Sequence, residues 1–333
     1  MVFKRMLSAL GVGGPSVDTV LTNPNTRPGL TLEGHVRLFG GEVAADIEQI
    51  SLALVTRVEV ESGDSEFAGT MEFYRMPVSG AFHLAPKQEL QIPFQLPVPW
   101  ETPITDVYGQ HLHGMVMGLR TDVAVARAVD KGDLDPIAVH PLPVHERILD
   151  AFARLGFRFK NADLERGHIY GVQQTLPFYQ EIEFFAAPQY AHTIREVELT
   201  FVTNPHTVDV IIECDKRGGL FTPGHDAIGR YVVDHASVDS TDWTALVDSW
   251  LSQTVANYSR FAAGHVQPGY PPHPGHHGGY PPHPGHHGHH GSGVGGMVAG
   301  AALGFAGGMI AGELIEEVFD GDDGDDGDFG FDE

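Results

Sequence analysis

The amino-acid sequence predicts an all-β fold, with two antiparallel β-sandwich domains in tandem, a few short helices and a disordered tail. Three observations lead to this fold class. Apolar and polar residues alternate along many short segments, most regularly between residues 50 and 60. Turn signals rich in glycine, proline and asparagine separate these segments at intervals of about 8 to 15 residues. The chain has 333 residues, too many for one sandwich of ordinary size.

The first domain is expected to consist almost entirely of strands. Pro93 falls inside one of them and indicates an edge strand, because proline cannot donate to the ladder. Residues 130–136 are rich in charge and are expected to connect the two domains as a hinge. Asp133 and Asp135 of this connector, and Trp100 of the preceding proline-rich loop, are candidate interaction residues. The expected strands are 17–21, 32–38, 50–60, 71–76, 78–84, 88–96 and 115–129.

The second domain begins with the most convincing internal helix. Val144, Ile148 and Phe152 share one helical face, Pro143 suits the first turn, and Gly156 suits the end. Cys214 alternates with apolar residues along its strand, which favours a core position over a reactive thiol. The expected strands are 157–159, 176–185, 197–203, 208–214 and 228–238, and a second helix is expected at 242–262.

The first residues carry a short apolar face made of Phe3, Met6, Leu7 and Leu10, next to the Lys4–Arg5 pair. The apolar run is too short and interrupted for a signal peptide. Two alternatives stay open: a terminal helix docked on the sandwich, or a basic amphipathic anchor on a membrane surface. The predicted organisation is an amphipathic helix at 1–14, sandwiches at 15–130 and 131–262 with helices near 143–155 and 242–262, a histidine-rich spacer at 263–291, a glycine-ladder helix at 292–318 and an acidic tail at 319–333.

Charge and cysteine content exclude some functions. The net charge is −24, and the last basic residue is Arg260. A chain that binds nucleic acid without sequence preference needs clustered lysine and arginine, so we expect no nucleic-acid partner. The single cysteine rules out an internal disulfide and fits a reducing, cytoplasmic compartment.

Several segments together resemble bacterial sporulation-control proteins of arrestin-like fold, of the actinobacterial type with a histidine-rich, glycine-ladder and acidic tail. The resemblance covers about residues 1 to 260. The segments that carry it are Gly13-Gly-Pro-Ser-Val-Asp-Thr-Val20, Leu90-Gln-Ile-Pro-Phe-Gln-Leu-Pro97, Val98-Pro-Trp-Glu-Thr-Pro103, Tyr108-Gly-Gln-His-Leu-His-Gly114, Asp133-Leu-Asp-Pro136, Ala151-Phe-Ala-Arg-Leu-Gly-Phe157 and Leu176-Pro-Phe-Tyr-Gln-Glu-Ile-Glu-Phe184.

The resemblance implies two tandem sandwiches, no enzymatic activity, no cofactor, and a cytoplasmic regulator or scaffold that acts through protein contacts during sporulation or cell differentiation. It does not identify the partner. The sequence itself contains no nucleophile elbow and no distinctive cysteine–histidine pairing, which agrees with a non-enzymatic chain.

The alternative function is metal binding or metal storage through histidines. His111 and His113 have i, i+2 spacing, which places both imidazoles on one face if the segment is a strand. Structural loop histidines are the competing interpretation. The spacer adds two copies of a ten-residue repeat and further candidate ligands: His273, His276, His277, His283, His286, His287, His289 and His290.

A glycine ladder follows the spacer, with a period of four residues at Gly296, Gly300, Gly304, Gly308 and Gly312. Such a smooth ridge suits close packing on another helix, so self-association or partner binding is one interpretation. Membrane insertion or peripheral membrane contact and a flexible low-complexity segment are the others. The aspartates that follow lack calcium-loop spacing and are expected to form a solubilising acidic end.

Overall fold

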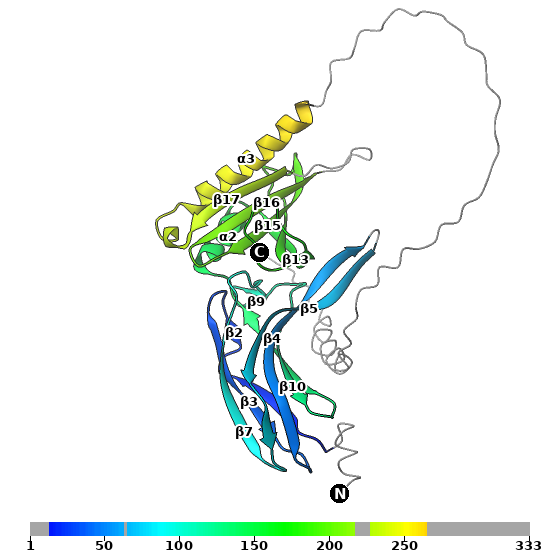
Figure 1. Cartoon of the computed structure of the whole chain (residues 1–333). Coiled ribbons are helices and arrows are strands. Elements are labelled where there is room, and N and C mark those ends of the chain that lie inside the picture. The colour runs from blue at the N-terminus through cyan, green and yellow to red at the C-terminus, as the bar shows by residue number, and fades with distance from the viewer. Residues whose placement is uncertain (1–12, 63–64, 217–226, 265–333) are drawn as a thin grey trace, which may run out of the picture.

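The computed structural model describes residues 13–62, 65–216 and 227–264, which form an elongated body of two halves (Figure 1). The predicted all-β class is confirmed. The elements of the N-terminal half are β1 (Ser16–Leu21), β2 (Asn25–Thr26), β3 (Thr31–Phe39), β4 (Ala45–Ser62), β5 (Ser65–Ser79), β6 (Phe82–Leu84), β7 (Glu89–Pro97), β8 (Asp106–Val107), β9 (Gln110–His111), β10 (Met117–Val125), β11 (Lys131–Pro136) and β12 (Ala138–Val139).

The elements of the C-terminal half are α2 (Pro143–Arg154), β13 (Arg158–Arg166), β14 (Phe178–Phe185), β15 (Ile194–Thr203), β16 (Thr207–Lys216), β17 (Ala227–Asp234), the short 3₁₀ turn η1 (His235–Ser237) and α3 (Trp243–Gly264). Neither described helix is long and apolar enough to cross a bilayer.

The N-terminal half is a sandwich of two antiparallel layers. One sheet has the order β1-β3-β7, and the facing layer contains β11, β10 and β4, with β5 and β6 paired to β4. Alternate residues of both layers, such as Val36, Leu52 and Leu119, are buried between them. Pro93 lies on β7 and pairs with His35 on β3. Among the described residues, β7 is the end strand of its sheet, as the proline predicted.

Most of the residues expected to connect the two domains, 130–136, lie in a strand. Lys131–Pro136 form strand β11, which pairs antiparallel with β10 from Val123 to Gly118. One of the charges that suggested a loop holds the strand in place: the Asp133 carboxylate accepts a hydrogen bond from the Thr19 N–H at 2.6 Å. Leu134 meanwhile packs against the apolar pair Ala53 and Val55. The chain therefore leaves the N-terminal half after β12 and enters α2 through residues 140–142.

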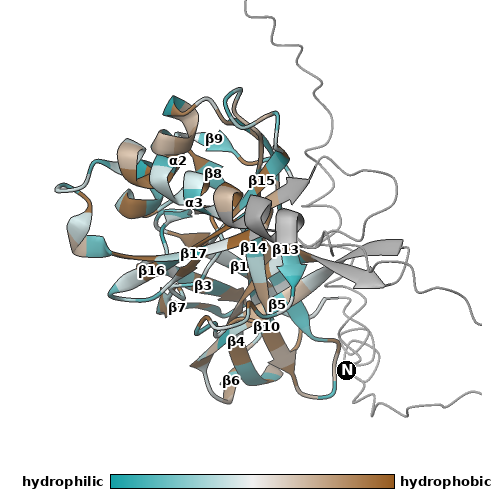
Figure 2. Cartoon of the chain, turned by 90° about the horizontal axis from the view of Figure 1, so that it is seen from above, coloured by the Kyte–Doolittle hydropathy of each residue, from teal (hydrophilic) through white to brown (hydrophobic). Residues whose placement is uncertain are grey.

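In the C-terminal half, five antiparallel strands of order β13-β14-β15-β16-β17 continue the ten-stranded sheet that contains β11, β10 and β4, because β13 pairs in parallel with β4. Helices α2 and α3 lie on one face of it, and Figure 2 shows apolar and polar residues mixed along both helices. Their buried residues, including Ile148, Phe152, Val247 and Leu251, meet the apolar side of the strands. Over this part of the sheet, the helices occupy the layer where a second sheet was expected. Cys214 is buried in this core, as predicted.

Candidate functional site

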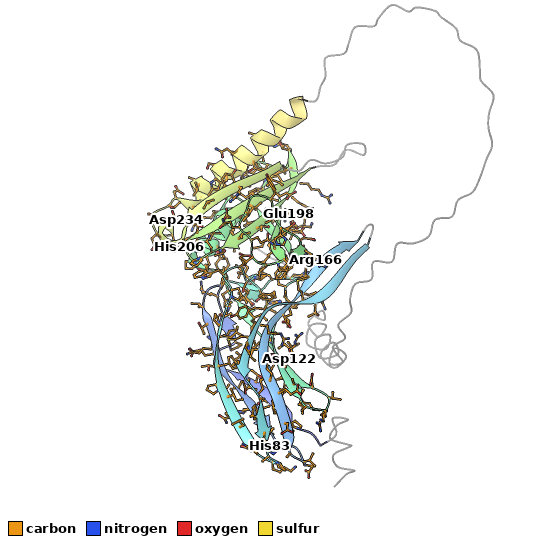
Figure 3. The ribbon with its side chains drawn as sticks, in the orientation of Figure 1. His83, Asp122, Arg166, Glu198, His206 and Asp234 are labelled. Carbon is orange, nitrogen blue, oxygen red and sulfur yellow. The ribbon has the colours of Figure 1, made fainter. Side chains whose placement is uncertain are left out.

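The outward face of the C-terminal sheet is rich in carboxylates. Side chains alternate along a strand, so the residues that do not face α2 and α3 point to the opposite side. We call this set of residues the acidic face: Asp163, Glu165, Glu181, Glu183, Glu196, Glu198 and Glu213. The strand register places like charges opposite one another at Asp163–Glu181, Glu183–Glu198 and Glu198–Glu213. Glu198 lies on the side of the body away from α3 (Figure 3).

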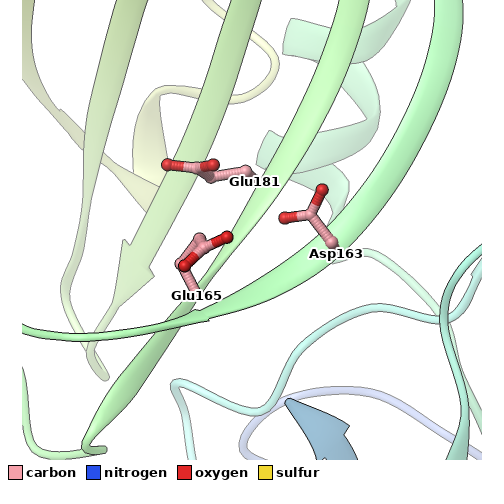
Figure 4. Close-up of side chains that lie close together, drawn as sticks. All are labelled: Asp163, Glu165 and Glu181. Carbon is pink, nitrogen blue, oxygen red and sulfur yellow. The ribbon is translucent and has the colours of Figure 1, made fainter. Parts of the chain in front are cut away.

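Three of these side chains converge at β13 and β14. Asp163, Glu165 and Glu181 each offer a carboxylate oxygen, and the three oxygens lie within 4.8 Å of one another (Figure 4). All three residues are partly buried. Like charges at this separation repel strongly when water is partly excluded, so the three groups cannot all stay ionised at low cost.

This repulsion favours the protonated form of one carboxyl group. Burial raises the pKa of Glu181 to about 9, and the charges of Glu198, Asp163, Glu165 and Glu213 add to the effect. The neighbouring Tyr179 has a pKa raised to about 12, first by burial and then by the charges of Glu181, Glu165, Glu213 and Glu198. The Glu181 carboxyl is therefore neutral at pH 7, and the surface around it keeps a negative potential.

The acidic face already binds one cationic side chain of the chain itself. The Lys160 ammonium contacts the carboxylates of Glu183 and Glu196, the latter at 2.7 Å. These two contacts raise the pKa of Lys160. Carboxylates from the adjacent strands β14 and β15 thus hold one ammonium group between them. The acidic face can bind lysine or arginine side chains, and its three convergent oxygens suit a hard divalent cation.

The predicted metal ligands His111 and His113 have different partners. His111 Nδ1 lies 3.6 Å from the Asp106 carboxylate, whereas His113 Nδ1 lies 3.0 Å from Asn161 Oδ1. Within the described residues, the group of three or more ligands close enough to share an ion is the Asp163 group, which contains neither histidine. Metal binding by His111 and His113 stays a prediction.

The predicted interaction residues lie in the N-terminal half and at its boundary with the C-terminal half. Asp133 caps the Thr19 N–H, and Asp135 is half-buried, with a pKa raised to about 7 by burial and by the charges of Asp133 and Asp18. The Trp100 ring lies 5.8 Å from the His235 ring. The structure does not bring Trp100 and the two aspartates together into one site. The histidines of the spacer and the glycines of the ladder lie outside the described residues.

Polar contacts join the two halves around Trp100. The Glu101 carboxylate accepts hydrogen bonds from the backbone N–H groups of Thr175 and Leu176 at 2.8 and 3.0 Å. The buried Gln180 amide bonds both the N–H and the C=O of Ile104, at 3.0 and 2.8 Å. These bonds hold the proline-rich loop against β14 and the segment before it.

A cavity of about 20 Å³ lies in this boundary, lined by Trp100, Thr102 and His145, among others. It has room for about one water molecule, and a small-molecule site is normally more than ten times larger. His145 is fully buried, its Nε2 lies 3.0 Å from Thr203 Oγ1, and burial lowers its pKa to about 3. This cavity is therefore structural.

Sequence reasoning missed the acidic face, although its signal is present. Acids occupy every second position in Asp163-Leu-Glu165 and Glu181-Ile-Glu183, opposite apolar neighbours. That spacing places each pair on one side of its strand. Only the pairing of β13 with β14 and of β14 with β15 shows that the pairs meet, and the sequence does not contain that pairing.

The fold and these surfaces define an arrestin-like β-sandwich protein. The family model described as SpoOM protein (Spo0M) matches residues 3–218, and the chain belongs to the Spo0M family. The sporulation-control protein spo0M of Bacillus subtilis (strain 168) is 34% identical over 216 residues, which cover 65% of this chain and 81% of that protein. The crystal structure of Spo0M from Bacillus subtilis superposes with a TM-score of 0.64 at 28% identity, covering 74% of this chain and 100% of that one. The family is one of sporulation-control proteins.

Proposed function

We propose that the chain is a non-enzymatic scaffold that controls sporulation by binding a protein partner, and that the acidic face receives a lysine- or arginine-rich segment of that partner. One observation carries the proposal: carboxylates of four adjacent strands point to one face of the sheet, while α2 and α3 occupy the other. Electrostatic complementarity of this kind steers association and selects the partner.

Two further observations support this function. The chain's own Lys160 occupies the edge of the acidic face and is held by two carboxylates, as a partner's lysine would be. The cavity behind Trp100 holds about one water molecule, which leaves no room for a substrate at the boundary between the halves.

The experiment compares three full-length proteins as baits in extracts of sporulating cells. The face variant carries Glu165→Gln and Glu198→Gln, and the control variant carries Glu33→Gln and Glu48→Gln, which removes the same number of charges elsewhere. Crosslinking and mass spectrometry identify what each bait captures. We expect a protein whose crosslinked lysines map to β13–β16 in the wild type and control, and whose yield falls at least about fivefold with the face variant. Equal yields from all three baits would exclude this face as the binding surface.

A second candidate function is metal binding, favoured by the convergence of the Asp163, Glu165 and Glu181 oxygens within 4.8 Å. An all-carboxylate set selects calcium, magnesium or manganese, whereas His111, His113 and the histidine-rich spacer would select zinc, copper or nickel. Titration calorimetry of the full chain separates these ions. Calcium binding that Glu165→Gln abolishes supports the carboxylate site, and zinc binding lost on removal of residues 265–333 supports the histidines.

The proposal also covers the location of the protein in the cell, its self-association and its domain boundary. We infer a cytoplasmic protein whose glycine ladder mediates self-association, with peripheral membrane contact as the alternative. We propose a domain boundary at 140–142 rather than at residue 130, and the pairing of β11 with β10 supports it. Light scattering and cell fractionation of the chain with and without residues 292–333 test the self-association and the membrane contact, respectively.

A further inference from the structure

A shallow groove of about 470 Å³ lies in the N-terminal half, where the described chain begins. Its lining consists of the backbones of Gly13, Gly14, Gly40 and Gly41 together with Ser16, Phe39, Glu42, Lys87 and Glu89. Phe39 pairs with Glu89 across β3 and β7 and keeps 39% of its surface exposed. An exposed phenylalanine beside bare backbone is an apolar surface without a partner among the described residues.

The course of the chain at this groove is fixed. The Glu42 N–H donates a hydrogen bond to the Gly13 carbonyl at 2.9 Å. A Cβ placed on Gly41 would lie 2.2 Å from the same carbonyl oxygen, so only glycine allows this close approach. Gly13 is thus held against the 40–42 turn. The first described residue, Gly13, therefore lies in the wall of the groove.

Residues 1–12 carry an apolar face that suits the exposed Phe39 ring. Phe3, Met6, Leu7 and Leu10 recur at helical spacing, and as a helix the segment would be about 18 Å long. Gly13 has φ of +70°, a left-handed conformation that lets the chain reverse direction beside the groove. Lys4 and Arg5 bring positive charge.

We propose that residues 1–12 fold back into this groove, with Leu7 and Leu10 against Phe39 and the Lys4–Arg5 pair near Glu89. Tethering favours this occupant, since a segment joined directly to its site has an effective concentration of about millimolar. A membrane surface is disfavoured because two cations give about 2 kcal/mol of attraction to an anionic bilayer, while the chain carries a net charge of −24.

Hydrogen exchange with mass spectrometry on the full chain tests the proposal from both sides. Phe39→Ser should lower the protection of the amides in residues 1–12 at least about tenfold, and Leu7→Ser should expose the amides of residues 39–42. Phe159→Ser, which changes a phenylalanine of similar exposure on β13, should alter neither segment. Phe39 and Leu7 are each tested separately, so a folding defect in one variant does not remove the test.

Three results would overturn the proposal. The first is unchanged exchange of residues 1–12 in Phe39→Ser. The second is protection that grows with protein concentration, which would mean that a second copy fills the groove. The third is binding of the wild type to phosphatidylglycerol vesicles that Leu7→Ser abolishes and Phe39→Ser leaves unchanged, which would make the segment a membrane anchor.

Discussion

Asp163 and Glu181 lie directly opposite each other on the antiparallel strands β13 and β14, and their carboxylates share a cluster with Glu165. Opposed like charges normally destabilise a sheet. Here the Glu181 carboxyl, with a pKa of about 9, stays protonated at neutral pH and relieves part of the repulsion. The chain thus has a crowded acidic surface at a cost in stability.

Glu181→Gln should stabilise the protein at pH 8. The pKa of Glu181 is higher in the folded state than in the unfolded state, so its contribution to stability is complete below about pH 4.5 and declines as the pH rises toward 9. Glutamine mimics the neutral carboxyl at every pH. We expect Tm to rise by about 2–6 °C at pH 8 and to change little at pH 4.5. Glu48→Gln, at an exposed position, is the control. Equal effects of the two substitutions would contradict the pKa assigned to Glu181.

His145 should make the protein sensitive to acid. Its pKa falls from about 6.5 in the unfolded chain to about 3 in the core, so the unfolded state binds a proton that the folded state excludes. Its contribution to stability is complete above pH 6.5 and is lost as the pH falls toward 3, by about 2–3 kcal/mol at pH 4.5. His145→Phe should flatten this part of the pH profile in urea unfolding. The exposed His206→Gln should leave the profile unchanged, and a His145→Phe profile as steep as the wild type would contradict the prediction.

Glu101→Gln should loosen the boundary between the two halves. The substitution weakens the charge-assisted bonds to the Thr175 and Leu176 N–H groups. We expect a loss of about 1–2 kcal/mol in the free energy of unfolding and faster proteolysis within residues 167–176. Glu33→Gln serves as the control, because Glu33 bonds Gln95 within the N-terminal half and not across the boundary. Proteolysis at the wild-type rate would show that these bonds do not hold the loop.

Gly29→Ala should displace the Trp100 ring. Gly29 has φ of +77°, and a Cβ there would lie 2.5 Å from the indole. Gly109 has φ of +76° with open space around it, so Gly109→Ala shares the backbone strain without the collision. We expect Gly29→Ala to cost about 2 kcal/mol more than Gly109→Ala and to shift the tryptophan fluorescence. Similar costs for both variants would show that the indole moves aside freely.

The strands of the N-terminal half were predictable because their burial follows a period of two and their turns carry glycine and proline. Residues 131–136 were not, because a short charged edge strand has no apolar alternation and resembles a loop in the sequence. Two contacts position β11: Leu134 packs on Ala53 and Val55, and Asp133 caps the Thr19 N–H. Both join residues that are far apart in the sequence.

The acidic face could be predicted in part. The spacing of Glu181 and Glu183 places both on one side of their strand, but their charge becomes a shared surface only when β13 and β15 flank β14. Strand order is set by how whole layers pack, and no local pattern contains it. His111 and His113, two residues apart, have separate partners in Asp106 and Asn161 because His111 ends strand β9 whereas His113 lies in the turn that follows it.

The most direct test of the acidic face is a titration of the full-length protein with a fluorescently labelled decalysine peptide, followed by fluorescence anisotropy at low and at physiological salt. The Glu165→Gln, Glu198→Gln variant should bind about tenfold more weakly than the wild type, because each removed carboxylate contributes roughly 0.5–1 kcal/mol. The Glu33→Gln, Glu48→Gln variant should stay within about twofold of the wild type. Equal weakening in both variants would mean that net charge alone attracts the peptide, and it would contradict the account of the acidic face as the binding surface.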